Sequence, residues 1–242
     1  MHLLSGEQAR AYCGSVWAHR ATAELVSSAR FERLATGLAR AGAPAELTQR
    51  ARDGAADERR HAALCVAAAE RFGAVVAKAA PPPLWRPLAT ADDVLREAVA
   101  FCALSESLNA TLMAVSLQRT TDDGLRTLLR ALLTDEVQHA RLGWAVLSWQ
   151  ATCRPCAFLD DWLLPTLQDA VADELLVAAN GANAGAYAGA DTPSEAAAAL
   201  GMLSARERLE LIAATLRDVV FPGLSHAGID CDAASRWVAT LG

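Results

Sequence analysis

The sequence has few aromatic residues and no excess of positive charge. Aromatic side chains make up 5% of the 242 residues, and two of them are tyrosines. The net charge is −6, so the basic surface of a general nucleic-acid-binding protein is not expected. Alanine, leucine, glutamate and arginine are abundant instead, and these residues favour α-helices. The composition excludes a disordered chain and argues against a fold dominated by β-structure.

The longest uncharged stretch of the sequence does not indicate a membrane span. The longest uncharged stretch, Leu175 to Ala190, contains glycine and asparagine and is too short and polar to cross a bilayer. The first residues, Met1 to Glu7, show no basic segment followed by an apolar run, so no secretory signal is expected. We therefore expect a cytoplasmic protein that binds neither membranes nor nucleic acid.

The cysteines do not form a pattern that indicates a disulfide framework or a thiolate metal site. Six cysteines are scattered along the chain, and only Cys153 and Cys156 have the Cys-x-x-Cys spacing. A rubredoxin-like site needs a second such pair, which the sequence lacks. We interpret the two residues as thiols in a loop, with a redox pair as the alternative.

Clear helix breakers divide the first part of the chain. Residues 41–44 include glycine and proline, residues 81–83 are three prolines, and residues 121–124 form a turn motif. These signals predict helices at four places, residues 5–40, 45–78, 91–119 and 124–151. The two short turns give two antiparallel hairpins, and the longer connection between them lets the hairpins pack as a four-helix bundle.

The pattern is weaker after Cys156. It predicts further helices at residues 160–179, 195–221 and 232–241, with a loop of small residues at 181–190. We interpret residues 1–151 as the bundle. Residues 152–242 are expected to form a helical extension that packs on the bundle within the same domain.

One pentapeptide pattern, Asp-Glu-x-x-His, occurs twice. It spans residues 57–61 in the second predicted helix and residues 135–139 in the fourth. Side chains three residues apart on an α-helix lie on one face about one turn apart, so the carboxylate and imidazole of each motif can reach one ion. This mixture of ligands suits iron or manganese better than it suits metals that prefer thiolates.

Each of the other two helices of the bundle carries one glutamate in an apolar segment, Glu24 in the first and Glu106 in the third. Counted in residues from the nearest hairpin turn, Glu24 and Glu106 lie about as far along their helices as the repeated motifs do along theirs. Glu32 lies too close to its turn to be at the same height in the bundle. Two divalent cations would balance the charge of four glutamates, whereas buried carboxylates without cations are costly. Salt bridges to arginine are the alternative. The candidate ligands are therefore Glu24, Glu58, His61, Glu106, Glu136 and His139.

This order of ligands closely resembles that of the ferritin-like dinuclear carboxylate proteins, and the motif style is closest to the di-iron oxygenases. In these proteins two helices of a four-helix bundle each give a Glu and two give Glu-x-x-His. The resemblance covers residues 5–151 and implies two iron ions, or manganese ions, that react with oxygen or peroxide. Bacterial multicomponent monooxygenases also carry Asp before Glu-x-x-His. By analogy, Asp57 and Asp135 would each hydrogen-bond the ligand histidine of the partner helix.

Among the functions of such proteins, an oxygenase or oxidase is our main hypothesis. The residue one turn after His61 is Cys65, which argues against the tyrosyl radical of ribonucleotide reductase small subunits. Ferritin subunits usually lack so long an extension, although a ferroxidase or a manganese catalase stays open. We expect an enzyme that uses dioxygen to hydroxylate or otherwise oxidise a small organic substrate. An external donor would supply electrons, because no flavin or nicotinamide motif is present. A homodimer is the default expectation.

Space for a substrate is expected close to the ligands. Small side chains lie about one turn away and either leave such space or allow close helix packing, at Cys65, Cys102, Ala110 and Gly143. Three tryptophans are candidates for a pocket wall or for the core, Trp17, Trp144 and Trp149.

Overall fold

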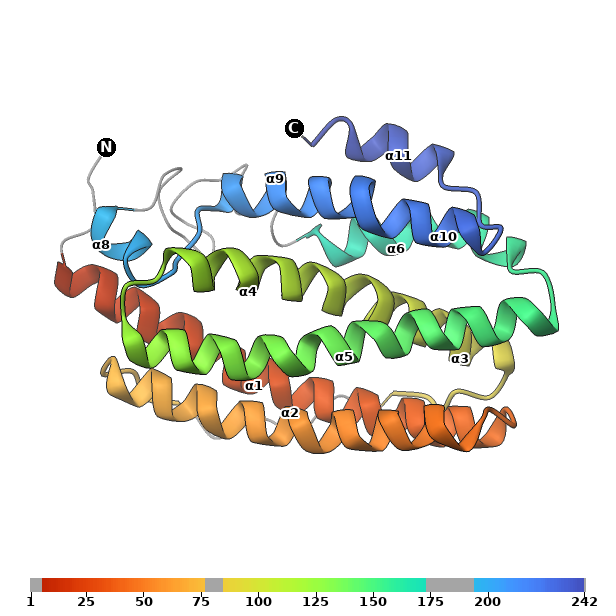
Figure 1. Ribbon diagram of the computed structural model, residues 1–242, viewed down its shortest axis with the longest axis horizontal. Coiled ribbons are helices and arrows are strands. Elements are labelled where there is room, and N and C mark those ends of the chain that lie inside the picture. Colours follow the sequence, from red (N-terminus) through yellow and green to blue (C-terminus); the bar gives the residue numbers. More distant parts are fainter. Residues whose placement is uncertain (1–5, 77–84, 173–193, 242) are drawn as a thin grey trace.

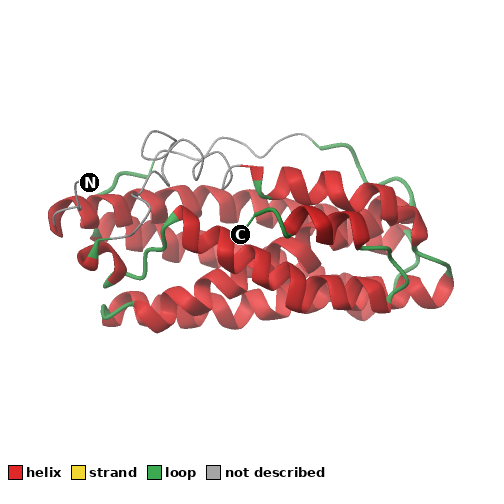
Figure 2. Ribbon diagram, turned by 90° about the horizontal axis from the view of Figure 1, so that it is seen from above, coloured by secondary structure: helices red, strands yellow, loops and turns green. Residues whose placement is uncertain are grey.

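The computed structural model describes residues 6–76, 85–172 and 194–241, and all its regular elements are helical (Figure 1). Helices α1 (Gly6–Arg40) and α2 (Ala45–Arg71) form one hairpin. The second hairpin pairs α5 (Asp123–Cys153) with a continuous run of three parts, namely α3 (Ala91–Glu97), the π-helical segment η1 (Ala98–Glu106) and α4 (Ser107–Arg119). The predicted all-α bundle of two hairpins is confirmed, and its helices are aligned along the long axis of the molecule (Figure 2).

The remaining described elements lie against one side of this bundle. They are a 3-10 turn (Ala157–Leu159), α6 (Asp160–Ala170), α8 (Glu195–Ala198), α9 (Ala205–Thr215), the π-helical segment η5 (Leu216–Val220), α10 (Phe221–His226) and α11 (Asp232–Val238). Helix α9 runs beside α4 (Figure 1). Leu163 of α6, Leu216 of η5 and Val238 of α11 belong to the same hydrophobic cluster as Phe101 and Leu142 of the bundle. The extension therefore covers apolar surface of the second hairpin.

Several helices end or change geometry where the sequence pattern predicted continuity. The second helix was expected to reach residue 78, but α2 ends at Arg71, and Gly73 follows with a φ of 81°. The predicted helix over 195–221 is broken at residues 199–204, where Gly201 has a φ of 76° and Ser204 caps α9 through the backbone N–H of Glu207. The predicted loop 181–190 and the end of the predicted helix 160–179 lie outside the described residues.

Two hydrophobic clusters divide the interior of the bundle. On α1, Phe31 belongs to one cluster and Trp17 to the other, and the buried Glu24 comes between them. Helices α2 and α5 repeat this order, with a buried glutamate and histidine between the two clusters, whereas Glu106 lies near the edge of the first cluster, after Leu104 and before Leu108. The fold therefore places one polar layer in the middle of an otherwise apolar core.

The third helix of the bundle is the most apolar of the described helices. By length and composition alone, the continuous run Ala91–Arg119 would be able to cross a membrane. In this structure it packs against α5 and supplies Glu106 to the polar layer. Its apolar composition therefore fits a core helix of the bundle.

Candidate metal centre

The polar layer brings together the six residues that the sequence analysis selected. Their exposed fractions are 3% or less, for Glu24, Glu58, His61, Glu106, Glu136 and His139. Their ligand atoms fall into two groups of four, with all atoms of a group within 4.8 Å of one another. One group adds Glu24 and His61 to the pair Glu58 and Glu136, and the other adds Glu106 and His139 to the same pair. Glu58 and Glu136 thus belong to both groups, as two carboxylates shared by two ions would.

Unsatisfied polar atoms test whether a pair of metal ions fits this layer. Both carboxylate oxygens of Glu58, Oε2 of Glu136 and the Nδ1 atoms of His61 and His139 are buried and make no well-oriented hydrogen bond, although the Nδ1 atoms lie 3.1 to 3.6 Å from these oxygens. Buried polar groups normally have partners, and leaving them without one is costly. Oxygen and imidazole donors gathered in this way are the ligands of iron and manganese. The residues therefore fit two such ions.

Without metal ions, the pKa values of the four carboxyl groups are shifted in two opposite directions. Burial raises the pKa of Glu24 to about 8, although Arg20 opposes this, and burial together with the Glu136 charge raises the pKa of Glu106 well above its ordinary value. Burial also acts on the shared Glu58, but the neighbouring imidazoles of His139 and His61 outweigh it and lower the pKa to about 2. The shared carboxylates are therefore ionised, while the two outer ones retain protons.

The two histidines carry the compensating charge. Burial lowers the pKa of His139, but the Glu136 and Glu58 carboxylates outweigh burial and raise the pKa to about 10. The pKa of His61 is raised for the same kind of reason, by Glu58 and Asp135 against the effect of burial. The metal-free layer thus holds protons at sites that metal ions would occupy, and metal binding must release them.

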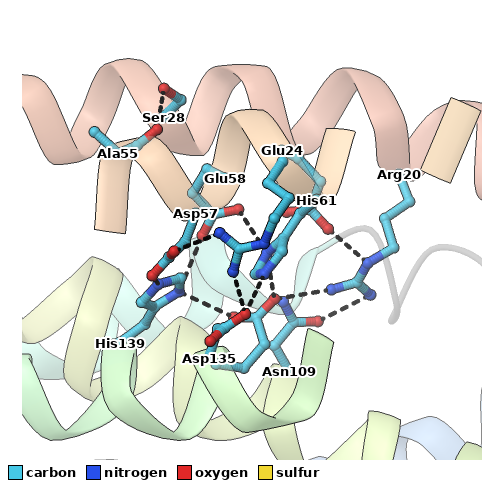
Figure 3. A network of polar contacts seen from close by, with 12 residues as sticks. Arg20, Glu24, Ser28, Ala55, Asp57, Glu58, His61, Asn109, Asp135 and His139 are labelled. Carbon is cyan, nitrogen blue, oxygen red and sulfur yellow. Dashed lines mark hydrogen bonds and ion pairs between the residues drawn. The ribbon is translucent and has the colours of Figure 1, made fainter. Parts of the chain in front are cut away.

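Two aspartates contact the Nε2 atoms of the imidazoles, whereas the Nδ1 atoms lie near Glu58 (Figure 3). His61 Nε2 of α2 is 3.1 Å from Asp135 Oδ2 of α5, and His139 Nε2 of α5 is 3.4 Å from Asp57 Oδ2 of α2. Each aspartate therefore contacts the histidine of the partner helix, which leaves both Nδ1 atoms directed at the polar layer. Arg60, whose role the sequence analysis missed, donates to both aspartates at 2.7 and 2.6 Å.

Arg20 is a second residue that the sequence analysis missed. Its Nε donates to Glu24 Oε1 at 2.7 Å, and its Nη2 lies 3.3 Å from Glu136 Oε1 (Figure 3). Its Nη1 contacts Asn109 Oδ1 of α4 at 3.4 Å. The spacing of Arg20 and Glu24, four residues apart on one helix face, was the available signal. By contrast, Glu32 is exposed and pairs with Arg59 at 2.6 Å, outside the polar layer.

The expected space beside the small residues is filled. Cys65 and Cys102 are fully buried, and a Cβ added at Gly143 would lie 2.2 Å from the backbone nitrogen of Ala103 in η1. These positions therefore allow close helix packing, which was one of the two interpretations. Trp144 packs against Gly223 of the extension, and Trp149 packs against the hydrophobic cluster that contains Phe31.

A cavity lies next to Arg20, which contacts Glu24, and none of the six candidate ligands lines it. It has a volume of about 110 Å³, and we call it the chamber. Helices α1, α4 and α5 and the extension line it, through residues that include Trp17, Arg20, Asn109, Leu112, Leu129 and residues 200–203. Trp17 is the only one of the three candidate tryptophans that lines this chamber.

The Cys-x-x-Cys motif lies away from these features, at the end of α5. Both thiols are free, with Cys153 exposed and Cys156 buried. Burial raises the pKa of Cys156, which favours the neutral thiol. The structure thus places the first thiol at the end of α5 and the second in the connection that follows it.

Comparison with known proteins supports the fold. No protein-family model matches the sequence, and no curated protein is significantly similar to it. A solved structure from Synechococcus, described as Protein 19 with aldehyde deformylating oxidase activity, superposes with a TM-score of 0.56 at 16% identity. The chain has a ferritin-like helical-bundle fold. The match covers 99% of this chain and 100% of the Synechococcus chain, so the shared fold includes the C-terminal extension as well as the bundle.

Proposed function

We propose that this protein is a dinuclear metal oxidoreductase that uses dioxygen to oxidise a small organic substrate. Two iron ions are the proposed cofactor, with manganese as the alternative. The observation that carries the proposal is the pair of four-residue groups that share Glu58 and Glu136. The proposed ligands are Glu24, Glu58, His61, Glu106, Glu136 and His139.

When bound in this layer, a pair of iron ions supplies the redox chemistry, namely the reduction of dioxygen and the oxidation of an organic molecule. The chain's own residues set the conditions for it. Asp57 and Asp135 fix the orientation of the imidazoles, and Arg60 holds the two aspartates together. Arg20 orients Glu24 and Glu136. The hydrophobic clusters on both sides of the layer exclude water.

The chamber favours an organic substrate over iron storage. It adjoins the ligands through Arg20, and the C-terminal extension forms part of its wall. A subunit that only oxidises and stores iron needs no such cavity beside its ligands. The oxidase activity in the description of the Synechococcus structure agrees with this class of reaction and leaves the substrate open. An external electron donor belongs to the proposal, and a homodimer remains an expectation.

Metal analysis and a reaction with air test the proposal. The protein purified after expression with iron should contain about two iron ions per chain. After anaerobic reduction, exposure to air should consume dioxygen once and then stop until a reductant is added. Continued formation of ferric oxide with each addition of ferrous iron would instead identify a ferroxidase. A protein that copurifies with manganese and decomposes hydrogen peroxide would identify a catalase.

Two variants provide the control for the ligand assignment. His139→Ala removes a proposed ligand and should lower the iron content below two per chain. Glu32→Ala removes a carboxylate that is exposed and bound to Arg59, so it should leave the iron content unchanged. Full iron content in His139→Ala would contradict the proposed site.

A further inference from the structure

The candidate centre contains two metal positions that share two carboxylates. Glu24 and His61 complete one, which we call the Glu24 position, and Glu106 and His139 complete the other, the Glu106 position. The two positions have the same kinds of ligand. A difference between them in metal affinity therefore has to come from residues outside the ligand set.

Arg20 brings a positive charge to one side of this centre. Its Nε donates to Glu24 Oε1 at 2.7 Å, and its Nη1 lies 3.4 Å from Asn109 Oδ1 (Figure 3). Its Nη2 lies 3.3 Å from Oε1 of Glu136, one of the shared carboxylates. In the described part of the chain, no other arginine forms an ion pair with a candidate ligand.

The two oxygens of Glu136 show on which side of the centre Arg20 lies. Oε1, which receives the Arg20 contact, is 3.9 Å from His61 Nδ1. Oε2 is 3.6 Å from His139 Nδ1 instead. The shorter contact of Arg20 is to Glu24, which belongs to the same group as His61. Two contacts therefore place the guanidinium beside the Glu24 position.

The arginines of α1 that lie near η1 pair with a glutamate that is not a candidate ligand. Arg30 lies over the ring of Phe101, 4.2 Å from its centroid, and its Nε donates to Glu97 at 2.8 Å. Arg33 donates to the other oxygen of Glu97 at 3.0 Å. Among the described residues, the Glu106 carboxylate thus has no arginine contact of the kind that Glu24 has.

Arg60 does not distinguish the two positions. It donates to Asp57 at 2.7 Å and to Asp135 at 2.6 Å, and each aspartate contacts one of the two histidines. Its side chain is also 51% exposed, against 20% for Arg20, so water screens its charge more strongly. The charge difference between the two positions therefore comes from Arg20.

A positive charge beside a metal position disfavours the binding of a cation there. A divalent ion carries twice the charge of a proton, so Arg20 disfavours the ion more than it disfavours a competing proton. The side chain of Arg20 is partly exposed, and solvent therefore screens part of this repulsion. The expected effect is a moderate loss of affinity at one position.

We propose that Arg20 selectively weakens the binding of the metal ion at the Glu24 position. This ion is released and replaced more readily than it would be without Arg20, while the ion at the Glu106 position is little affected. Arg20 is thus a residue that adjusts metal affinity through its charge, without being a ligand. The inference rests on the proposed function, because it requires a centre of two ions.

Titration calorimetry with manganese(II) chloride tests the inference on the metal-free full chain. Two bound ions repel each other, so even two equal positions would fill in separate steps. Variants that keep a single outer glutamate avoid this difficulty, since Glu106→Gln retains the Glu24 position and Glu24→Gln retains the Glu106 position. Arg20→Gln is combined with each of them, and all titrations use the same pH and salt concentration.

Removal of the Arg20 charge should act on one position. In the Glu106→Gln background, Arg20→Gln should strengthen manganese binding about ten-fold, whereas in the Glu24→Gln background the change should stay below about three-fold. Arg20→Lys keeps the charge and should keep the weaker binding. Arg30→Gln is the matched control and should change neither affinity, because Arg30 lies on the same helix with a side chain 27% exposed and pairs with Glu97.

The direction of the change separates this role from a structural one, since a disturbed centre would bind manganese more weakly. Unchanged or weaker binding when Arg20→Gln is added to Glu106→Gln would overturn the inference, and so would an equal gain in both backgrounds. If Arg20→Gln does not fold, Arg20→Met removes the same charge and is titrated instead. A wild-type protein that binds neither manganese nor iron would overturn the proposed function as well, which distinguishes the two failures.

Discussion

The two halves of the metal centre have matching ligands but different surroundings. Each half consists of one outer glutamate, one histidine and the two shared carboxylates. Around Glu24 the structure places Arg20, Asn109 and the chamber. Around Glu106 it places the π-helical segment η1 and closely packed side chains.

The packing around Glu106 is dense for identifiable reasons. Phe31 lies with its ring centroid 4.8 Å from that of His139 and 4.7 Å from that of Phe101. Gly143 of α5 lets the backbone of η1 approach closely. The Glu24 half, which Arg20 links to the chamber, is therefore the less densely packed of the two. The two halves carry the same kinds of side chain from the repeated motif, and residues outside the motif decide how much space surrounds each half.

The largest expected effect is a difference in metal content between variants of a shared glutamate and variants of an outer one. Glu136→Ala removes a carboxylate that belongs to both groups, so the metal content should fall from about two ions to well below one per chain. Glu24→Ala affects one group only and should leave about one ion. Elemental analysis of both variants measures this difference. Equal metal contents in the two variants would mean that the centre is not built from shared carboxylates.

The repeated motif made the clustering of the two glutamate–histidine pairs predictable, because helical periodicity converts a spacing of three residues into neighbouring side chains. Glu24 and Glu106 were predictable from their apolar neighbours and their level in the bundle. Arg20 and the chamber were not, because they depend on how α1 meets α4 and the extension, which no local pattern encodes. The small residues Cys102 and Gly143 were ambiguous for the same reason, since a small side chain permits either a cavity or close packing.

The second prediction tests how closely the side chains and backbone around Glu106 are packed. Gly143→Ala places a methyl group against the backbone of η1, so we expect a loss of about 3 kcal/mol in the free energy of unfolding, as for overpacked cores. Gly6→Ala is the control, because a Cβ there meets no atom within 4 Å. Urea denaturation of the metal-free proteins measures both. A stable Gly143→Ala variant would show that the Glu106 half has more space than its contacts indicate.

The third prediction concerns the two aspartates that contact the histidines of the candidate centre. Asp135→Asn weakens the partner of His61, and Asp57→Asn weakens that of His139. Each should lower metal affinity about 10-fold to 100-fold, the usual effect of losing such support. The shorter contact, 3.1 Å against 3.4 Å, predicts the larger loss for Asp135→Asn. Competition with a metal chelator measures the affinities, and unchanged values would remove the aspartates from the centre.

The smallest effect is a pH dependence of the metal-free protein. The pKa of Glu24 is about 8 in the folded chain against 4.5 ordinarily, and that of His139 is about 10 against 6.5. The folded state therefore binds more protons than the unfolded state in the range between these values, so stability falls as pH rises. We expect a lower Tm at pH 8.5 than at pH 6. Scanning calorimetry measures it, and a Tm that rises with pH would contradict the proton assignment.

Two amide variants divide this pH dependence between the halves. Glu24→Gln keeps the shape of the side chain without its titration, so it should flatten the fall in Tm between pH 6 and 8.5. Glu106→Gln should flatten the fall over the same range and should also act at higher pH, where Glu24 no longer contributes, because burial and the Glu136 charge raise the pKa of Glu106 well above its ordinary value. Metal loading should remove the fall in both cases, since the ions replace the protons. Equal effects of the two variants above pH 8.5 would mean that the two outer glutamates share one environment, against the difference between the halves.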